Sequence, residues 1–206
     1  MNFPNTLSVL RIVLSPVFMI LFLTGSGPAV QISFFVFTIA ALTDWYDGWY
    51  ARKYGFKTKW GRFLDPLADK ILTSCALLAF YLFYKAEPGF FGTNRIIPVW
   101  ILIAVIILRD IILTAVRSYM ELKGRGFKTS MISKTKTFLQ MVYIFCVIGF
   151  FAIGLTFSGT GFGQAVRGLV FSGLNYYSLM IISILTAASG VAYIFESNSP
   201  ADSLPA

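Results

Sequence analysis

The sequence predicts an all-α integral membrane protein, and two observations support this prediction. Of the 206 residues, 57% are hydrophobic and 13% are charged, against roughly 25% charged residues in an average soluble domain. In addition, the stretch from Ile12 to Thr43 contains no charged residue. It is longer than the ~20 residues that cross a bilayer. The turn-forming segment Gly25 to Pro28 divides it into two spans.

Hydropathy extends this interpretation to six transmembrane helices. The expected helices run from Leu7 to Leu23, Ala29 to Tyr50, Gly61 to Tyr84, Ile96 to Val116, Phe138 to Leu155 and Leu169 to Phe195. The purely apolar part of the third, Ile71 to Tyr84, is too short to span a membrane alone. This helix must begin earlier, which draws Asp65 and Asp69 to the membrane boundary. A signal peptide is the alternative for the first helix, but only Arg11 precedes the apolar run and no small-residue cleavage site ends it.

Basic residues determine the expected orientation. They surround the connection after the second helix (Arg52, Lys53, Lys57, Lys59, Arg62, Lys70) and the connection after the fourth (Arg117, Lys123, Arg125, Lys128, Lys134, Lys136). The opposite side carries only Lys85, Arg95 and Arg167, so both termini are expected in the cytoplasm. We therefore expect a multi-pass protein of the cytoplasmic membrane. Residues 1–206 would form a single six-helix domain, with a flexible polar tail over 195–206.

The composition also excludes several classes of chemistry. The chain has no histidine, which removes Ser-His triads, His-ligated zinc and phosphohistidine intermediates. Cys75 and Cys146 lie in apolar segments without a neighbouring metal ligand, so packing is their expected role. The net charge of +8 is explained by topology and anionic lipid headgroups rather than by nucleic acid.

Four aspartates lie at the facing ends of the second and third expected helices. Helical spacing places them, together with small residues, on one face of each helix. The two sets are Asp44, Asp47, Gly48 and Ala51 at i, i+3, i+4 and i+7, and Gly61, Asp65 and Asp69 at i, i+4 and i+8. Intramembrane carboxylates normally face a watery cavity. We therefore expect a polar active-site cavity at the cytoplasmic side, where the small residues leave room for a nucleotide and its diphosphate.

Four neighbouring carboxylates repel one another unless cations neutralise them. Oxygen ligands without His or Cys favour Mg²⁺ or Mn²⁺, and a pair of such ions can hold the attacking and leaving oxygens of a phosphoryl transfer. We therefore expect two Mg²⁺ or Mn²⁺ ions at these four aspartates. The alternative is that they are helix caps and loop charges paired with the surrounding Lys and Arg.

These residues also match a known signature at every position. The segment Asp44-Trp-Tyr-Asp47-Gly48-Trp-Tyr-Ala51-Arg52, followed after eight residues by Gly61, Asp65 and Asp69, resembles the pattern D-x2-D-G-x2-A-R-x8-G-x3-D-x3-D of the CDP-alcohol phosphotransferase family. The six-helix membrane fold of that family covers essentially the whole chain. The resemblance implies transfer of a phosphatidyl group from CDP-diacylglycerol to an alcohol, by an enzyme that forms a homodimer.

The resemblance implies roles for single residues. Asp44 and Asp65 would bridge two metal ions and Asp47 would hold one of them. Asp69 would bind the other ion and act as the catalytic base. The expected CDP-diacylglycerol site consists of Asn5, Thr6, Gly48, Ala51, Arg52, Thr58 and Gly61, with Arg52 on the diphosphate. For Asn5 and Thr6 the alternative role is to cap the first helix.

A group of basic residues predicts the acceptor. Arg109 lies within the fourth apolar segment, and Asp110 is not expected to neutralise it because adjacent side chains on a helix point apart. A phosphate on the acceptor would satisfy such cations. The expected ligands of this phosphate are Arg109, Arg117, Lys134 and Lys136. The segments 108–117 and 133–141 resemble the phosphatidylglycerophosphate synthase branch of the family, in which Glu is more familiar at the position of Asp110. This resemblance implies that the acceptor is glycerol 3-phosphate. For Arg117, Lys134 and Lys136 the alternative is ordinary flanking of membrane spans.

Two functional alternatives stay open. Within the family, the acceptor could instead be serine, inositol phosphate or another alcohol. In a different class, intramembrane acids and Arg could belong to an ion-coupled transporter. A transporter predicts acids scattered near mid-bilayer in several helices, whereas here they cluster near one surface beside small residues.

Overall fold

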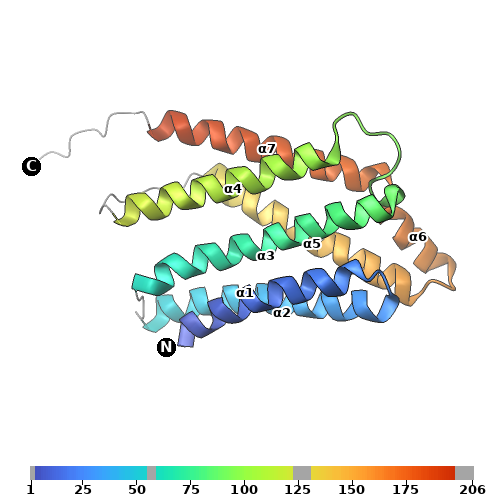
Figure 1. The fold of residues 1–206 in the computed structure, drawn as a ribbon, viewed down its shortest axis with the longest axis horizontal. Coiled ribbons are helices and arrows are strands. Elements are labelled where there is room, and N and C mark those ends of the chain that lie inside the picture. The colour runs from blue at the N-terminus through green and yellow to red at the C-terminus, as the bar shows by residue number, and fades with distance from the viewer. Residues whose placement is uncertain (1–2, 55–58, 123–130, 198–206) are drawn as a thin grey trace, which may run out of the picture.

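The computed structural model describes the backbone of residues 3–54, 59–122 and 131–197, and within these ranges every regular element is a helix (Figure 1). Side chains are described for residues 6–43, 46, 65–116, 118, 120, 133 and 135–191. The elements are α1 (Phe3–Leu23), α2 (Gly27–Tyr54), α3 (Lys59–Ala86), the 3-10 helix η1 (Pro88–Phe91), α4 (Val99–Leu122), α5 (Met131–Thr156), α6 (Gly161–Val170) and α7 (Gly173–Ser197). The all-α class predicted from the sequence is therefore confirmed.

Most of the long helices are apolar enough to cross a membrane. Among the described residues, five segments meet this criterion: Thr6–Leu23, Asp65–Ala86, Val99–Val116, Thr135–Thr156 and Gly161–Val191. In α2 the described apolar part, Gly27–Thr43, is shorter, and the helix continues beyond it to Tyr54. The whole of α2 nevertheless has 28 residues, about 42 Å at 1.5 Å per residue, which exceeds the ~30 Å hydrocarbon core.

The start of α5 differs from the prediction, because the helix begins at Met131 rather than at Phe138. From Ser133 to Thr137 the additional residues are polar, yet Ser133 and Lys136 are buried, as is Gln140 in the next turn. These three residues lie at i, i+3 and i+7 and therefore share one face of the helix. A polar segment can extend the helix here because this face points into the bundle, where it finds partners.

The predicted helix from Leu169 to Phe195 is wrong at its start. The chain forms two helices there, the short α6 and the long α7. Between them, Ser172 Oγ accepts a hydrogen bond of 3.2 Å from the backbone N–H of Leu174. A side-chain oxygen in this position satisfies one of the N–H groups that a helix start leaves without a partner. Leu169 therefore lies in the last turn of α6 instead of beginning the next helix.

The six long helices of the described chain form a closed ring in the order α2, α1, α3, α4, α7 and α5, with α5 returning to α2. α1 packs along both α2 and α3, so it joins the two helices that carry the acidic signature. Figure 1 shows the start of α1, the end of α2, the start of α3, the end of α4 and the end of α7 at the same end of the bundle. We refer to this end, marked by Phe3 and Ser197, as the terminal end.

The interior changes character along the bundle. Away from the terminal end it is aromatic: the ring centroid of Phe22 lies 5.3 Å from that of Phe80, 5.5 Å from that of Phe83 and 5.7 Å from that of Phe151. Toward the terminal end the buried residues include the polar and charged side chains of Ser8, Arg11, Ser15, Asp110, Ser133, Lys136 and Gln140. The aromatic half packs the helices together, and the polar half lies where the acidic signature lies.

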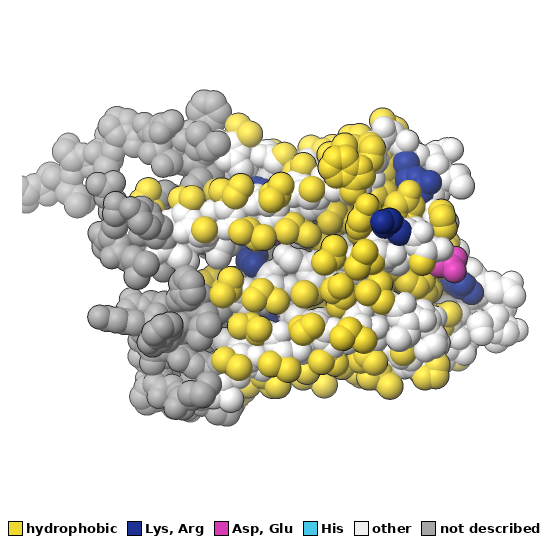
Figure 2. All heavy atoms as spheres, viewed as in Figure 1, with side chains coloured by type: hydrophobic (Ala, Val, Ile, Leu, Met, Phe, Trp, Pro, Cys, Tyr) yellow, Lys and Arg dark blue, Asp and Glu magenta, His cyan; other side chains and the backbone are white. Residues whose placement is uncertain are grey.

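The outer surface of the bundle is also apolar. Figure 2 shows hydrophobic side chains over the middle of the bundle, and large exposed ones include Ile20, Phe35, Leu108 and Ile184. An apolar surface of this extent is compatible with contact to lipid chains and not with contact to water. The molecule therefore has the exterior of a multi-pass membrane protein.

Candidate active site

Two of the four signature aspartates are described with their side chains, and both lie in the first half of α3. Asp65 and Asp69 are one helical turn apart, so they project from the same face. Asp65 Oδ1 accepts a hydrogen bond of 2.6 Å from Ser8 Oγ of α1. Asp69 Oδ2 lies 3.1 Å from Lys70 Nζ, and the Asp69 side chain is 20% exposed. A neighbouring helix therefore orients Asp65, whereas Asp69 retains access to a ligand.

Ser8 is a residue that the sequence analysis missed. Its side chain is buried, and so are those of Arg11 and Ser15, which follow at i+3 and i+7 on the same face of α1. Phe18 and Phe22 continue this face into the aromatic core. The sequence feature that could have identified Ser8 is a polar face at the start of an otherwise apolar helix. Such a face points inward, because lipid would not solvate it.

The other signature residues lie in helices whose backbone is described. The structure places Asp44, Asp47, Gly48, Ala51 and Arg52 in the second half of α2 and Gly61 in the first turn of α3, whereas Thr58 lies outside the described residues. The side chains of these residues are not described. Within the described side chains, no group of three or more acidic or cysteine residues could hold a metal ion. The convergence of the four carboxylates stays a prediction.

The N-terminal residues predicted to cover the nucleotide lie inside α1. This helix begins at Phe3, so Asn5 and Thr6 belong to its first turn. The alternative that they cap a helix beginning at Leu7 is therefore wrong. Thr6 is exposed, and the side chain of Asn5 is not described. Both residues lie at the terminal end, and their role in binding CDP-diacylglycerol stays a prediction.

The described donors fit a hard divalent cation. Asp65 and Asp69 offer carboxylate oxygens one turn apart, and the chain has no histidine that would favour a softer ion. The hydrogen bond from Ser8 to Asp65 is the kind of outer contact that orients a metal-binding carboxylate. In the predicted site, Asp44 and Asp47 would complete the set from α2.

The prediction that Asp110 does not neutralise Arg109 is wrong. Arg109 Nη1 lies 3.1 Å from Asp110 Oδ1, because the long guanidinium side chain turns back far enough to reach its neighbour. Arg109 Nη2 also donates a hydrogen bond of 3.2 Å to Ser133 Oγ of α5. Its Nε has no hydrogen-bond partner among the described residues. On the α7 side, a Cβ built at Gly190 would lie 3.4 Å from Arg109 Cγ, so the side chain of Arg109 lies close to α7 at this glycine.

Asp110 is the centre of a buried ion-pair network. Lys136 Nζ donates hydrogen bonds of 2.6 and 2.7 Å to the two carboxylate oxygens of Asp110. Lys70 Nζ lies 4.0 Å from Asp110 Oδ2. The side chains of Asp110 and Lys136 are 2% and 1% exposed. A charged side chain at the centre of a membrane helix costs ~2.5–3.5 kcal/mol on insertion scales, so mutual pairing is what allows both to be buried.

Two of the four predicted phosphate ligands therefore meet in the described structure. Arg109 of α4 and Lys136 of α5 share the carboxylate of Asp110. Arg117 lies in α4 and Lys134 in α5, but their side chains are not described. The network of Asp69, Lys70, Arg109, Asp110 and Lys136 connects the predicted base on α3 to the predicted phosphate ligands on α4 and α5.

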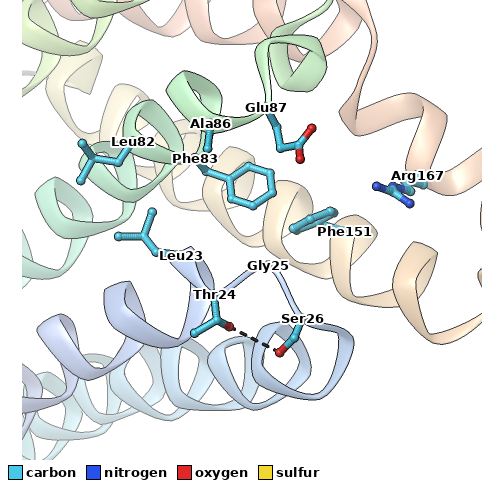
Figure 3. A pocket seen from close by; sticks show the side chains of 10 residues that line it. All are labelled: Leu23, Thr24, Gly25, Ser26, Leu82, Phe83, Ala86, Glu87, Phe151 and Arg167. Carbon is cyan, nitrogen blue, oxygen red and sulfur yellow. Dashed lines mark hydrogen bonds between the residues drawn. The ribbon is translucent and has the colours of Figure 1, made fainter.

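A cavity of about 360 Å³ lies at the opposite end of the bundle from these residues (Figure 3). It is bordered by the turn between α1 and α2, where Thr24 Oγ1 and Ser26 Oγ are 3.5 Å apart. Its other walls include Phe83, Phe151 and Arg167. This cavity contains no predicted site residue. It is distinct from the polar active-site cavity that the sequence predicts at the cytoplasmic side, which stays a prediction.

Comparison with known proteins identifies the family to which the chain belongs. Residues 1–191 match the sequence model of the CDP-alcohol phosphatidyltransferase family. The chain belongs to this family. A 34% identical relative from Bacillus subtilis (strain 168) aligns over 193 residues, 86% of this chain and 94% of the relative. A relative from Wigglesworthia glossinidia brevipalpis is 35% identical over 152 residues, 72% of this chain and 77% of its own.

A relative from Rickettsia typhi (strain ATCC VR-144 / Wilmington) is 29% identical over 192 residues, 93% of this chain and 94% of its own. All three relatives bear the name CDP-diacylglycerol–glycerol-3-phosphate 3-phosphatidyltransferase. The family predicted from the aspartate signature is thereby confirmed. The chain is an enzyme of the CDP-alcohol phosphatidyltransferase family.

Proposed function

We propose that this protein transfers the phosphatidyl group of CDP-diacylglycerol to sn-glycerol 3-phosphate, releasing CMP and phosphatidylglycerophosphate. The observation that supports this acceptor is the position of Lys70, which lies 3.1 Å from Asp69 and 4.0 Å from Asp110. It links the predicted base to a cluster of cations that suits a phosphate. An acceptor that carries both a hydroxyl and a phosphate fits this arrangement, and relatives that align with most of the chain bear the corresponding name.

The proposed reaction is a displacement at the phosphorus atom that carries the diacylglycerol. The hydroxyl oxygen of glycerol 3-phosphate forms a new P–O bond, and the bond between this phosphorus and the diphosphate bridging oxygen breaks. The electron pair leaves with CMP, and the hydroxyl proton passes to Asp69 as general base. Arg52 would hold the diphosphate, with Asn5, Thr6 and Thr58 at the nucleotide. Gly48, Ala51 and Gly61 would leave room beside the helices.

The four aspartates Asp44, Asp47, Asp65 and Asp69 would hold two Mg²⁺ or Mn²⁺ ions. Such ions, when bound, neutralise the charge that develops on the diphosphate and on CMP. The residues of the chain position the ligands: α1 orients Asp65 through Ser8, and Asp69 lies next to the cation cluster through Lys70. The phosphate of the acceptor would bind Arg109 and Lys136, with Arg117 and Lys134 contributing from the same two helices.

The proposed setting is the cytoplasmic membrane, with six spans. α2 would be the sixth span, beside the five segments described above. The terminal end would face the cytoplasm, because the connections from α2 to α3 and from α4 to α5 are rich in basic residues and adjoin helices that end or begin there. Both termini and the active site would then lie on the cytoplasmic side, where water-soluble glycerol 3-phosphate is available. A homodimer is the proposed assembly.

Membership of the family favours this reaction over the transporter alternative. The test is CMP release by purified protein from CDP-diacylglycerol, with glycerol 3-phosphate, serine, inositol or inositol phosphate as acceptor and with Mg²⁺ or Mn²⁺. Release that requires both the metal and glycerol 3-phosphate is the expected result. Release with another acceptor would keep the chemistry and overturn the acceptor assignment. No release with any acceptor would overturn the proposed function.

A further inference from the structure

Asp110 is an acidic residue surrounded by the cations of the predicted phosphate site, in a part of the bundle where a negative charge is unexpected. It lies within the apolar segment Val99–Val116 of α4, and its neighbours Ile111 and Ile112 are exposed on the outer surface. Asp110 itself points inward and is buried. A carboxylate close to a phosphate site would repel the phosphate, so its presence there is unexpected unless it serves the cations around it.

The contacts of Asp110 reach three different helices. Both carboxylate oxygens accept hydrogen bonds from Lys136 of α5, at 2.6 and 2.7 Å. Arg109 of α4 lies at 3.1 Å and Lys70 of α3 at 4.0 Å. One carboxylate therefore sets the relative positions of three cations that come from separate parts of the chain.

The charges of this network do not cancel. Among its described residues, the three cations Lys70, Arg109 and Lys136 share the two carboxylates of Asp69 and Asp110, which leaves one positive charge. Arg109 Nε has no hydrogen-bond partner among the described residues. Donor capacity and positive charge are therefore both left for an anion after the internal pairs have formed.

We propose that Asp110 is a positioning residue for the acceptor phosphate. It holds the ammonium of Lys136 and the guanidinium of Arg109 in one fixed arrangement, and it does not itself contact the substrate. Lys70 also forms an ion pair with Asp69. The same network therefore fixes the positions of the phosphate ligands relative to the general base. This inference rests on the proposed function and adds to it a residue with a specific role.

The alternative is that Asp110 only allows Lys136 to be buried and stabilises the fold. The two roles make different predictions. Loss of a purely structural contact would lower the stability of the protein and weaken the binding of both substrates together. Loss of a positioning contact would act on glycerol 3-phosphate alone, because the expected CDP-diacylglycerol residues lie on α1, α2 and α3 and in the connection between α2 and α3.

The first test compares Asp110→Asn with the wild-type enzyme, measuring kcat and KM for each substrate in detergent with Mg²⁺. We expect the KM for glycerol 3-phosphate to rise about tenfold or more, and the KM for CDP-diacylglycerol to stay within about twofold. Asp110→Glu keeps the charge and should restore most of the affinity for glycerol 3-phosphate. Equal effects on both substrates, or no effect on either, would overturn the proposal.

Thr186→Val is the matched control. Thr186 is also buried in the polar interior, and its hydroxyl donates to the backbone oxygen of Ile182 in its own helix α7 at 2.6 Å. The substitution keeps the shape of the side chain and lies outside the network, so both KM values should match the wild type. A rise in the KM for glycerol 3-phosphate in this control would show that any buried polar change has the same effect, and would overturn the assignment to Asp110.

The double variant Asp110→Asn/Lys136→Met tests the proposal even if Asp110→Asn alone does not fold, because it does not leave Lys136 buried without its closest partner. Because Asp110 also holds Arg109, the KM of the double variant for glycerol 3-phosphate should equal or exceed that of Lys136→Met, while its KM for CDP-diacylglycerol stays within about twofold of the wild type. A wild-type KM for glycerol 3-phosphate in the double variant, or equal rises in both KM values, would overturn the proposal. No turnover of glycerol 3-phosphate by the wild type would instead overturn the proposed function, and this inference with it.

Discussion

Ser8 Oγ donates a hydrogen bond of 2.6 Å to Asp65 Oδ1, which joins the start of α1 to the first half of α3. The bond has the length of a hydroxyl bound to an ionised carboxylate. Ser8 is buried, so water does not compete strongly for its hydroxyl. α1 therefore does more than fill the space between α2 and α3, because it determines which way a predicted metal ligand faces.

Ser8→Ala should weaken binding of the metal ion. Removing an outer partner of a metal-binding carboxylate typically reduces metal affinity or activity by about 10–100-fold. Mn²⁺ binding, followed by electron paramagnetic resonance of the free ion, measures this effect without turnover. The matched control is Ser15→Ala, which removes a buried hydroxyl from the same face of α1, where it bonds the backbone oxygen of Arg11. Unchanged Mn²⁺ affinity in Ser8→Ala would contradict the assigned role.

Asp69→Asn should abolish turnover while CDP-diacylglycerol binding is largely retained. The amide keeps the size of the side chain and offers a neutral oxygen ligand, but it cannot accept the hydroxyl proton. Loss of a general base reduces the rate by about 10²–10⁴-fold. Single-turnover CMP release measures the chemical step, and equilibrium binding of CDP-diacylglycerol measures the ground state. A variant that retains substantial activity would rule out Asp69 as the base.

The acidic signature and the helical class could be predicted because both depend on short sequence ranges. The aspartates of α2 and α3 recur at helical spacing, and charge-free stretches of membrane-spanning length need no knowledge of the partner helices. The break between α6 and α7 was harder to predict. Apolar residues lie on both sides of Ser172 and Gly173, and the cap at Ser172 becomes visible only in the structure.

The pairings of the site could not be predicted, because they depend on how distant helices pack. The hydrogen bond from Lys136 to Asp110 joins residues of two helices, and the ion pair of Arg109 with Asp110 depends on the conformation of a long side chain. The rule that adjacent residues point apart describes Cα–Cβ directions, and a guanidinium can reach beyond them. The cations of the site can therefore be identified from the sequence, but the carboxylate that neutralises them cannot.

Arg109→Ala should raise the KM for glycerol 3-phosphate by about 10–100-fold, the loss expected from one charge-assisted contact to a phosphate. The KM for CDP-diacylglycerol should not change, because Arg109 contacts α5 and α7 rather than the signature helices. Arg109→Lys keeps the charge but cannot reach Asp110 and Ser133 together, so it should give an intermediate KM. Steady-state kinetics with each substrate varied in turn measures these values. An unchanged KM in Arg109→Ala would contradict the phosphate assignment.

Phe22→Ala should destabilise the protein without a specific effect on either substrate. The ring of Phe22 is fully buried and lies against Phe80, Phe83 and Phe151 from two other helices. Truncating a buried Phe to Ala costs about 3–5 kcal/mol, because it removes apolar contacts and leaves a cavity. Phe35→Ala is the matched control, since the Phe35 side chain is 63% exposed on the outer surface of α2. Thermal unfolding in detergent should show a clearly lower midpoint for Phe22→Ala and a nearly unchanged one for Phe35→Ala.

Both variants should keep the wild-type KM values at low temperature, because the aromatic half of the bundle lies away from the terminal end. Equal midpoints for the two variants would show that the Phe22 cluster does not hold α1, α3 and α5 together.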